Sequence, residues 1–346
     1  ADIIVVNTCG FIQSAKEEAI DTILEMADYK EIGKCKALIV TGCLAKRYKS
    51  QIIESMPEVD LVIGVDEYEN ISEILSNFFN QKKLLNQYKF TQKLDFNNRV
   101  ISSTYPLAYI RISDGCDNRC SYCAIPLIRG RFKSRKMEDI LQEVENLARQ
   151  GIKEFCIISQ DTSKYGLDIY GELKLAELLK KMSQIDGVKW IRILYMYLFE
   201  TTDELIEEIG KNDKVCKYFD IPIQHLNDRL LKDMNRHDTK QIIFDRIQKI
   251  RQIVPEAILR TTCIVGFPGE TEKEFEELLD GIKEIKFDRL GAFTYSREED
   301  TKSYDFENQI DEDIKEKRLK KLFDVQKEIS LEKNKQRLGK EYEVII

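Results

Sequence analysis

The sequence lacks any run of about 18 apolar residues, the length that crosses a membrane, although 42% of its 346 residues are hydrophobic. It also lacks an excess of positive charge, because 54 Lys and Arg face 61 Asp and Glu and give a formal net charge of −7. Binding of nucleic acid through overall charge is therefore disfavoured, although a local basic patch is compatible with this total. The opening residues 1–6 do not have the pattern of a secretory signal. These absences predict a globular, cytoplasmic protein that binds no membrane.

Cysteine, in contrast, is abundant. The chain has nine cysteines, an odd number at uneven spacings, which is not the pattern of a disulfide framework. In a reducing compartment such cysteines are either buried apolar residues or metal ligands. The position of each cysteine in the predicted fold therefore decides between the two roles.

The first 75 residues alternate short β-branched runs with helical stretches. We expect strands at 3–6, 37–40 and 61–63, and helices at 14–28 and 45–56. This βαβ alternation predicts a small parallel sheet covered by helices, so we assign residues 1–75 to an N-terminal domain. Residues 76–104 are polar and weakly periodic, which indicates a linker with one strand-like piece near 89–91.

From residue 105 the alternation returns on a larger scale. Strands are expected at 108–113, 154–159, 190–195, 218–223, 259–266 and 289–295, and helices at 137–149, 173–183, 203–209, 239–254 and 272–285. Six strands favour a partial (β/α)6 or complete parallel barrel over residues 105–337, although spacing alone also allows an open sheet. Either architecture gathers ligands at the carboxyl ends of the strands. A closing helix at 312–336 has alternating charges, which indicate a solvated face.

Three cysteines follow the first expected barrel strand: Cys116, Cys120 and Cys123, in the sequence Cys-Asp-Asn-Arg-Cys-Ser-Tyr-Cys. Thiolates at i, i+4 and i+7 can surround one iron–sulfur centre or a zinc ion. A closed structural zinc site needs a fourth ligand, and the next cysteine downstream, Cys156, lies inside an expected strand. Three ligands instead leave one iron open to a substrate or cofactor.

This spacing, with Tyr122 before the third cysteine, resembles the signature of radical S-adenosylmethionine (SAM) enzymes. The resemblance implies a [4Fe–4S] cluster on the three cysteines. Its open iron chelates the amino and carboxylate groups of SAM, and one electron then cleaves the sulfonium to give an adenosyl radical. The cofactor carries this chemistry, while the protein supplies position and dryness. The resemblance assigns no side chain as a catalytic acid, base or nucleophile.

Cys9 and Cys43 each follow one of the first two expected strands at the same distance. If these strands are parallel neighbours, both thiols lie at one sheet edge, and the strand spacing of about 4.8 Å puts both within reach of one cluster. Cys35 lies at the opposite end of the second strand and is too distant to join them. Geometry alone leaves two alternatives open for Cys9 and Cys43, metal ligands or buried cysteines.

The whole chain resembles the methylthiotransferases, a branch of the radical SAM enzymes with two clusters. The motifs Asn-Thr-Cys9-Gly and Thr-Gly-Cys43 match two of the three cysteines that hold the auxiliary [4Fe–4S] cluster in that family. The resemblance places the other cysteine upstream of Ala1, so we expect a truncated N-terminal domain with an incomplete auxiliary site. Residues 338–346 resemble the start of the family's C-terminal TRAM-like β-barrel.

Two short motifs bear on the substrate. Residues 160–166 and 220–225 resemble the RimO-type branch, which methylthiolates the β-carbon of an aspartate on the twelfth small-subunit ribosomal protein. The alternative is the MiaB-type branch, which acts on a tRNA adenosine and needs a basic surface for phosphates. A third possibility is a non-catalytic iron–sulfur protein, but such proteins normally complete four thiolates per cluster. We therefore expect a ribosomal-protein partner, a reduced flavodoxin or ferredoxin-like electron donor, and no direct tRNA substrate.

Five further residues are candidates for cofactor binding: Tyr122, Asp161, Gln224, Gly266 and Glu270. Each has a plainer alternative. Tyr122 can be a packing residue, and the turn from Gly266 to Glu270 can simply precede a helix that Thr271 caps. His225 fits a structural role and a catalytic role equally well. The remaining strand cysteines, Cys156, Cys216 and Cys263, are expected to be packing residues.

Overall fold

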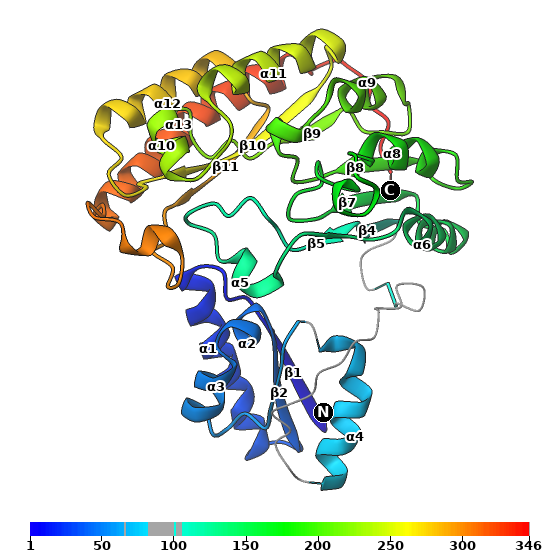
Figure 1. Cartoon of the computed structure of the whole chain (residues 1–346), viewed down its shortest axis with the longest axis vertical. Helices are drawn as coiled ribbons and strands as arrows, with labels where there is room; N and C mark the ends of the chain where they lie inside the picture. The colour runs from blue at the N-terminus through cyan, green and yellow to red at the C-terminus, as the bar shows by residue number, and fades with distance from the viewer. Residues whose placement is uncertain (66, 82–99, 102–105, 346) are drawn as a thin grey trace. The chain divides into compact units, whose positions relative to one another are not determined.

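The computed structural model describes residues 1–65, 67–81, 100–101 and 106–345, and the chain forms two compact units (Figure 1). The first comprises residues 1–99, 123–130 and 296–304, and the second comprises residues 100–122, 131–295 and 305–346. The N-terminal unit thus includes two short segments that are distant in the sequence. The sequence-based boundaries at 75 and 105 did not anticipate either segment.

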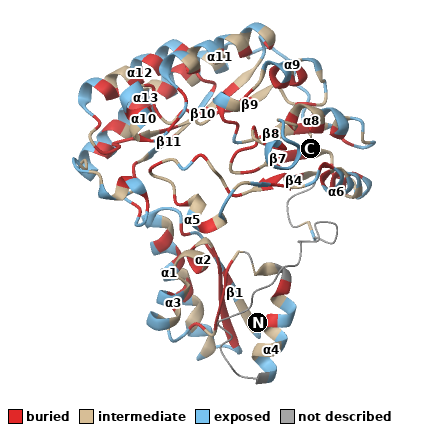
Figure 2. Ribbon diagram, viewed as in Figure 1, coloured by how far each residue is buried: buried red, intermediate tan, exposed pale blue. Residues whose placement is uncertain are grey.

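The first unit is built on a parallel sheet of three strands in the order β1 (Ile3–Thr8), β2 (Ala37–Gly42) and β3 (Leu61–Ile63). Alternate residues of β2 face opposite sides, as a strand period of two requires. Leu38 and Val40 pack with Ile23 of α1 (Gln13–Ala27), whereas Ile39 packs with Ile74 of α4 (Ile71–Gln81). Helices therefore cover both faces of the sheet, and every residue of β2 is buried (Figure 2).

Two predictions for this unit were wrong in detail. The expected helix at 45–56 is divided at Tyr48 into α2 (Cys43–Arg47) and α3 (Lys49–Ser55), because the Tyr48 backbone (φ −123°, ψ 30°) leaves the helical region. The expected linker begins too early, because α4 continues to Gln81. The apolar residues of α4 at positions 71, 74 and 75 pack against β3. One apolar stripe is enough to form a surface helix, so the polar residues on its other face did not prevent a helix here. The strand-like piece near 89–91 lies outside the described residues.

The second unit contains six parallel strands in two sheets. These are β4 (Leu107–Arg111), β7 (Glu154–Ile158) and β8 (Trp190–Ile193) in one sheet, and β9 (Tyr218–Asp220), β10 (Ile258–Val265) and β11 (Arg289–Thr294) in the other. A parallel bridge between Ile191 and Val215 joins them, and the Met196 N–H donates to the Asp220 carbonyl at 2.8 Å. The strands therefore follow one another in chain order around an arc (Figure 1). This arrangement confirms the predicted partial (β/α)6 barrel.

Helices surround the arc on its outer side (Figure 1). They are α6 (Met137–Arg149), α8 (Leu175–Ser183), α9 (Asp203–Lys211), α11 (Lys240–Ile253), α12 (Glu272–Ile285) and α13 (Glu312–Lys335). One continuous apolar core lies between these helices and the strands. Burial alternates along β10, because successive side chains of a strand point to opposite faces and every second one packs into this core.

Several short elements were not predicted from the sequence. They are β5 (Ser113–Asp114), β6 (Lys133–Ser134), α5 (Ile125–Arg129), α7 (Leu167–Tyr170), α10 (Asp228–Asp233) and the 3-10 turns Asp28–Lys30, Tyr68–Asn70, Leu198–Glu200 and Lys302–Asp305. Residues 338–345 form no strand in the described chain, so their resemblance to the start of a β-barrel stays a prediction. Among the helices described, none has the length and apolar character needed to span a bilayer.

Helix α13 differs from the expectation of a purely solvated face. Its polar side chains Lys315, Arg318 and Gln326 are buried together with Leu322 and Ile329. Lys315 Nζ donates to the Tyr295 carbonyl at 3.0 Å, and Arg318 Nη1 donates to the Glu270 carbonyl at 3.0 Å. The alternating charges therefore include two cations that hold backbone segments of the barrel.

Candidate functional site

The loop with three cysteines leaves the barrel after β4 and β5. Its backbone turns through two left-handed residues, Gly115 (φ 74°) and Arg119 (φ 50°). Asn235 Nδ2 donates at 3.0 Å to the carbonyls of both Asn118 and Arg119, so the residues that follow α10 hold the loop. A non-glycine residue in this conformation persists only where the surroundings determine it, and such positions cluster at functional sites.

The donor chemistry of the loop fits an iron–sulfur cluster. Cys116, Cys120 and Cys123 are each half-buried, and thiolates are the ligands such clusters use. Burial raises the pKa of the Cys116 thiol to about 11, so without a cation this residue keeps its proton. Metal binding displaces such protons. In the part of the chain that the structure describes, no three His, Cys, Asp or Glu side chains already have a metal-binding arrangement, so the three ligands stay a prediction.

Unpaired polar atoms mark the barrel end beside this loop. Within the described chain, the buried atoms here that have no hydrogen-bond partner include Gln160 Oε1, Tyr197 Oη, Glu200 Oε2, Gln224 Oε1, Arg236 Nε and Asp238 Oδ1. Their residues lie in the segments that follow β7, β8 and β9. Buried polar groups are normally paired, so a concentration of unpaired ones indicates a place for a polar ligand. Carboxyl strand ends are also where barrels bind ligands.

Asp161 is buried and connects the end of β7 to the cysteine loop. Its Oδ2 accepts a hydrogen bond from Asn118 Nδ2 at 2.8 Å, and its Oδ1 accepts from the Ser163 N–H and hydroxyl at 3.1 and 2.6 Å. Lys164 donates to the other side of the Asn118 amide. Both Asp161 oxygens are thus engaged within the protein. The geometry gives Asp161 a role in positioning the loop, and the preceding residue, Gln160, has a buried side-chain oxygen without a partner among the described residues.

Gln224 and Tyr122 have different environments. Gln224 has a left-handed backbone (φ 67°) and hydrogen bonds to Thr262 and Ile264 of β10, while its side-chain oxygen has no partner among the described residues. This supports the predicted polar contact. Tyr122 packs against a small apolar cluster that includes Met234 and Phe267. Packing is therefore established for Tyr122, and its contact with the cofactor stays a prediction.

The turn between β10 and α12 is stabilised from inside by Glu270. The carboxylate Oε2 accepts hydrogen bonds from the backbone N–H groups of Gly266 and Phe267. Burial raises the pKa of Glu270 to about 7, and its Oε1 lies 3.5 Å from Arg318 Nη1 and 4.0 Å from His225 Nε2. Glu270 therefore holds the turn in place from its buried side.

Two neighbours of this turn complete its support. A Cβ on Gly266 would overlap the side chain of Lys315, so glycine is needed here because α13 packs against the turn. His225 is fully buried, its Nδ1 accepts a hydrogen bond from the Asn227 N–H at 3.0 Å, and burial lowers its pKa to about 3. The histidine is therefore neutral, and its complete burial favours the structural alternative. Thr271 and Glu274 form the capping box of α12.

Sequence reasoning missed Arg236, the most deeply buried cation near the loop. Its Nη2 donates to the Pro222 carbonyl at 2.8 Å and pairs with Asp238 at 3.1 Å, and its guanidinium lies 3.8 Å from the centre of the Tyr197 ring. Burial would lower the pKa of Arg236, yet the neighbouring Tyr122, Tyr197 and Cys120 raise it above its ordinary value. A fixed positive charge beside Cys120 suits an anionic cluster or a carboxylate.

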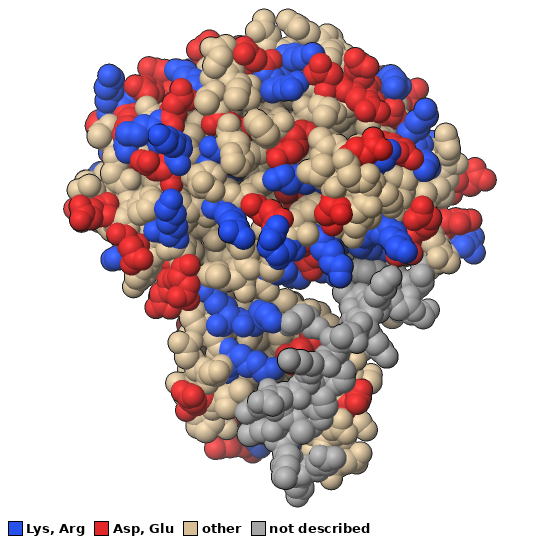
Figure 3. Space-filling model, viewed as in Figure 1, with Lys and Arg blue, Asp and Glu red and all other residues tan. Residues whose placement is uncertain are grey.

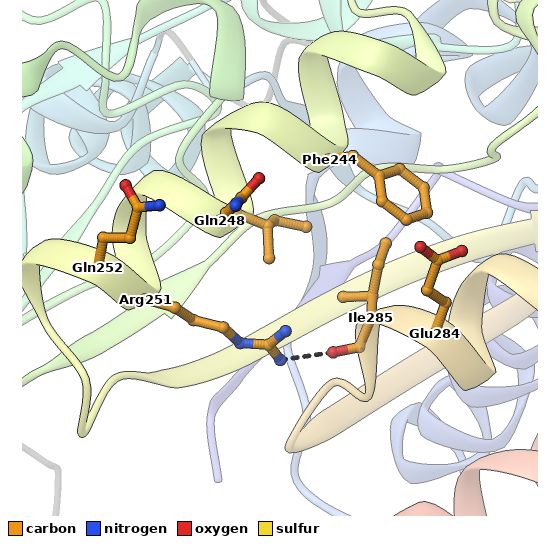
Figure 4. Close-up of a pocket in the computed structure, with 7 residues that line it drawn as sticks. Phe244, Gln248, Arg251, Gln252, Glu284 and Ile285 are labelled. Carbon is orange, nitrogen blue, oxygen red and sulfur yellow. Dashed lines mark hydrogen bonds between the residues drawn. The ribbon is translucent and has the colours of Figure 1, made fainter.

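Arg236 follows a short helix rather than a strand, so no pattern in the sequence distinguished it from a surface arginine. Of the barrel cysteines predicted to be packing residues, Cys156 and Cys263 are buried and Cys216 is half-buried. A surface pocket between α11 and α12 contains no cysteine and none of the predicted site residues (Figure 4). Its lining includes Phe244, Arg251 and Glu284, and we assign it no part in the chemistry.

In the first unit, Cys9 and Cys43 lie at the same sheet edge. Strands β1 and β2 are parallel and in register up to the pair Thr8–Gly42, so the next residue of each strand is a cysteine. A Cβ on Gly10 would lie 2.7 Å from the Leu44 nitrogen, so the two cysteine-bearing segments approach closely. Cys35 is buried before β2, at the other end of that strand. Cys9 is exposed and Cys43 is half-buried, so the pair fits the ligands of a shared cluster better than it fits buried core cysteines.

Gly42 provides a test of this close approach. Its backbone (φ 99°, ψ −158°) is one that side chains rarely adopt, and a Cβ here would overlap the Thr8 carbonyl oxygen. Gly130 in the same unit has nearly the same backbone (φ 75°, ψ −155°), and of the described residues none comes within 4 Å of its Cβ position.

We expect Gly130→Ala to lower the free energy of unfolding by about 1–3 kcal/mol, the cost of the backbone conformation alone. Gly42→Ala should lower it by clearly more, because the overlap adds to the same strain. Urea denaturation of both full-length variants measures the difference. Equal losses would show that β1 and β2 are not this close at Gly42.

Comparisons with known proteins agree on the family. The description "Radical SAM superfamily" matches residues 110–282, and "Uncharacterized protein family UPF0004" matches residues 1–64. The ribosomal protein uS12 methylthiotransferase RimO of Clostridium botulinum is 52% identical over 348 aligned positions, which cover all of this chain and 78% of that protein. The RimO of Clostridioides difficile is 50% identical with the same coverage.

Among solved structures, the radical SAM methyltransferase TsrM from Kitasatospora setae, with cobalamin and a [4Fe–4S] cluster bound, has a TM-score of 0.64. The match covers 84% of this chain and 63% of TsrM at 14% identity, so it supports the fold alone. Full coverage of this chain at about half identity, together with the cysteine loop and both domain matches, establishes the relationship. This chain belongs to the RimO family of ribosomal protein uS12 methylthiotransferases, within the radical SAM superfamily.

Proposed function

We propose that this chain adds a methylthio group to the β-carbon of an aspartate on ribosomal protein uS12. The observation that carries the proposal is the alignment of RimO proteins with the whole chain at about 50% identity. The resemblance identified from residues 160–166 and 220–225 had already favoured this branch over the tRNA branch. The enzyme is a radical SAM methylthiotransferase, and its cofactors are SAM and two [4Fe–4S] clusters.

The barrel residues would bind and orient the cofactors. When bound on Cys116, Cys120 and Cys123, a [4Fe–4S] cluster supplies the electron that cleaves SAM to methionine and an adenosyl radical. The unpaired side-chain oxygens of Gln160 and Gln224 would accept hydrogen bonds from polar groups of SAM. Arg236 would balance negative charge beside the cysteine loop, and the β10–α12 turn that Glu270 supports would pack against the cofactor.

Selectivity for the substrate hydrogen then depends on where the aspartate side chain lies relative to the radical. The β-hydrogen of an aspartate is unactivated, so the radical must lie within van der Waals distance of it, and orientation supplies much of the rate. Cys9 and Cys43 would hold the auxiliary cluster from which sulfur is inserted. A protein substrate presents no row of phosphates, which fits a net charge of −7. Acidic and basic side chains are interspersed over most of the face in Figure 3.

We further propose that the enzyme works in the cytoplasm, where ribosomal proteins and reducing conditions are found together. Reduction of the barrel cluster calls for a low-potential donor, and a reduced flavodoxin or ferredoxin-like protein fits this need. We expect tRNA not to be a substrate.

Mass spectrometry of uS12 from cells with and without the gene tests the function. We expect a methylthio-aspartate in uS12 that disappears when the gene is deleted and returns when the full-length protein is restored. Restoration with the Cys116→Ala variant is the matched control and should leave uS12 unmodified. An unmodified uS12 in cells with the intact gene would refute the proposal.

A further inference from the structure

A buried ion triad lies in the first unit, close in the chain to both auxiliary cysteines. Glu298 Oε2 accepts hydrogen bonds from Lys16 Nζ at 3.0 Å and from Arg47 Nη1 at 2.9 Å, and its Oε1 accepts from the Ser296 hydroxyl at 2.8 Å. The side chains of Lys16, Arg47 and Glu298 are only 11%, 3% and 2% exposed. Ionised groups this deeply buried are costly unless each has its partners, so the triad needs all three members.

Arg47 links the triad to the cysteine-bearing segments. Its Nη1 also donates to the Gly10 carbonyl at 3.1 Å, directly after Cys9, and its Nη2 donates to the Glu299 carbonyl. Arg47 is also the last residue of α2, a single-turn helix that begins at Cys43. One guanidinium therefore holds the backbone after Cys9 and the helix that starts at Cys43.

The anion comes from a distant part of the sequence. Residues 296–304 belong to the first compact unit, although in the chain they directly follow the barrel strand β11. The Gln13 N–H donates to Ser296 Oγ at 3.4 Å, and the Tyr48 hydroxyl donates to Glu299 Oε2 at 3.2 Å, so this segment is bound at several points. Burial alone would raise the pKa of Glu298, but hydrogen bonds from Lys16, Ser296 and Arg47 hold it below its ordinary value.

The charges of the triad do not cancel. Two cations and one anion leave an excess of one positive charge, and Arg47 Nε is buried without a hydrogen-bond partner among the described residues. An iron–sulfur cluster with thiolate ligands is anionic, and hydrogen bonds and charges around its ligands tune its potential and stability. A net positive, largely buried triad that contacts the residue after Cys9 and includes the last residue of the helix beginning at Cys43 is suited to that task.

We propose that Glu298 is a positioning residue for the auxiliary cluster, because through Arg47 it fixes the segments that bear Cys9 and Cys43. This inference rests on the proposed function, since it assumes that these cysteines hold a cluster. It assigns a part of the auxiliary site to the chain segment that leaves the last barrel strand. Outer-sphere partners of this kind typically change metal affinity or activity by about 10–100-fold when they are replaced.

The test uses the full-length protein in which Cys116, Cys120 and Cys123 are replaced by alanine, so that only the auxiliary cluster can form. Glu298→Gln is compared with Glu25→Gln, a Glu-to-Gln change at an exposed position of α1. After anaerobic reconstitution, we expect Glu298→Gln to lose iron to a chelator about 10-fold faster or more, and to alter the electron paramagnetic resonance signal of the reduced cluster. Glu25→Gln should match the parent in both.

A second variant covers the case in which Glu298→Gln does not fold. Arg47→Lys keeps the charge, but its single nitrogen cannot bridge Gly10, Glu298 and Glu299 together, so it should show the same two changes more weakly. With the barrel cysteines restored, both variants should still cleave SAM while forming less methylthio product.

Iron loss and spectra equal to those of Glu25→Gln would overturn the inference. Parallel loss of SAM cleavage and methylthio transfer would also overturn it, because a general folding defect predicts that result. Failure of the unaltered enzyme to modify uS12 would instead refute the proposed function, and the chelator comparison would still decide the role of Glu298.

Discussion

Replacing Cys116, Cys120 and Cys123 together by alanine should abolish reductive cleavage of SAM. Three thiolates in one loop are the predicted ligands of the cluster whose open iron would bind SAM, and alanine provides no donor atom. We expect the rate of deoxyadenosine formation under anaerobic conditions with a chemical reductant to fall to that of a reaction without enzyme. Chromatography of the nucleoside products measures this rate directly.

A matched control separates loss of the cluster from a general effect of removing sulfur. Cys216→Ala changes a half-buried cysteine of the same barrel that lies in none of the predicted sites. It should retain most of the cleavage activity. If the triple variant still cleaved SAM at a rate comparable with the control, the radical assignment of this loop would be wrong.

The second large effect concerns the auxiliary site. Cys9→Ala in the full-length protein should leave SAM cleavage nearly unchanged and eliminate the methylthio product, because Cys9 lies beside Cys43 on a separate sheet. Both products can be quantified in the same reaction by mass spectrometry. Cys35→Ala, at the opposite end of β2, is the control and should keep both activities.

This prediction depends on two separable sites. Loss of cleavage and of transfer to the same degree in Cys9→Ala would show that the two groups of cysteines do not act independently. Full retention of transfer would remove Cys9 from the auxiliary ligand set.

The strands and main helices could be predicted because their signals are local. Residues 61–63, 137–149 and 272–285 have the predicted bounds, since β-branched runs and amphipathic periods depend only on neighbours in the sequence. The two cysteine groups were found in the same way. A fixed spacing identifies one loop, and two parallel strands that end at equal distances place Cys9 beside Cys43.

Sequence reasoning missed the contacts between residues that are far apart along the chain. Glu298 meets Lys16 and Arg47 across about 250 or more residues of chain, and no periodicity reports such a pairing. The alternating charges of α13 suggested solvent, whereas Arg318 holds the carbonyl of Glu270. Buried charges of this kind are distinguished from surface charges only by their partners, which come from elsewhere in the fold.

The substrate assignment is tested most directly by one competition experiment. The reconstituted full-length enzyme is incubated anaerobically with SAM, a reductant, unmodified uS12 and unmodified tRNA in the same vessel, and both macromolecules are digested and analysed by mass spectrometry. Our account predicts methylthio-aspartate in the uS12 peptides and no methylthio-adenosine in the tRNA. Methylthio-adenosine in the tRNA together with an unchanged uS12 mass would contradict it.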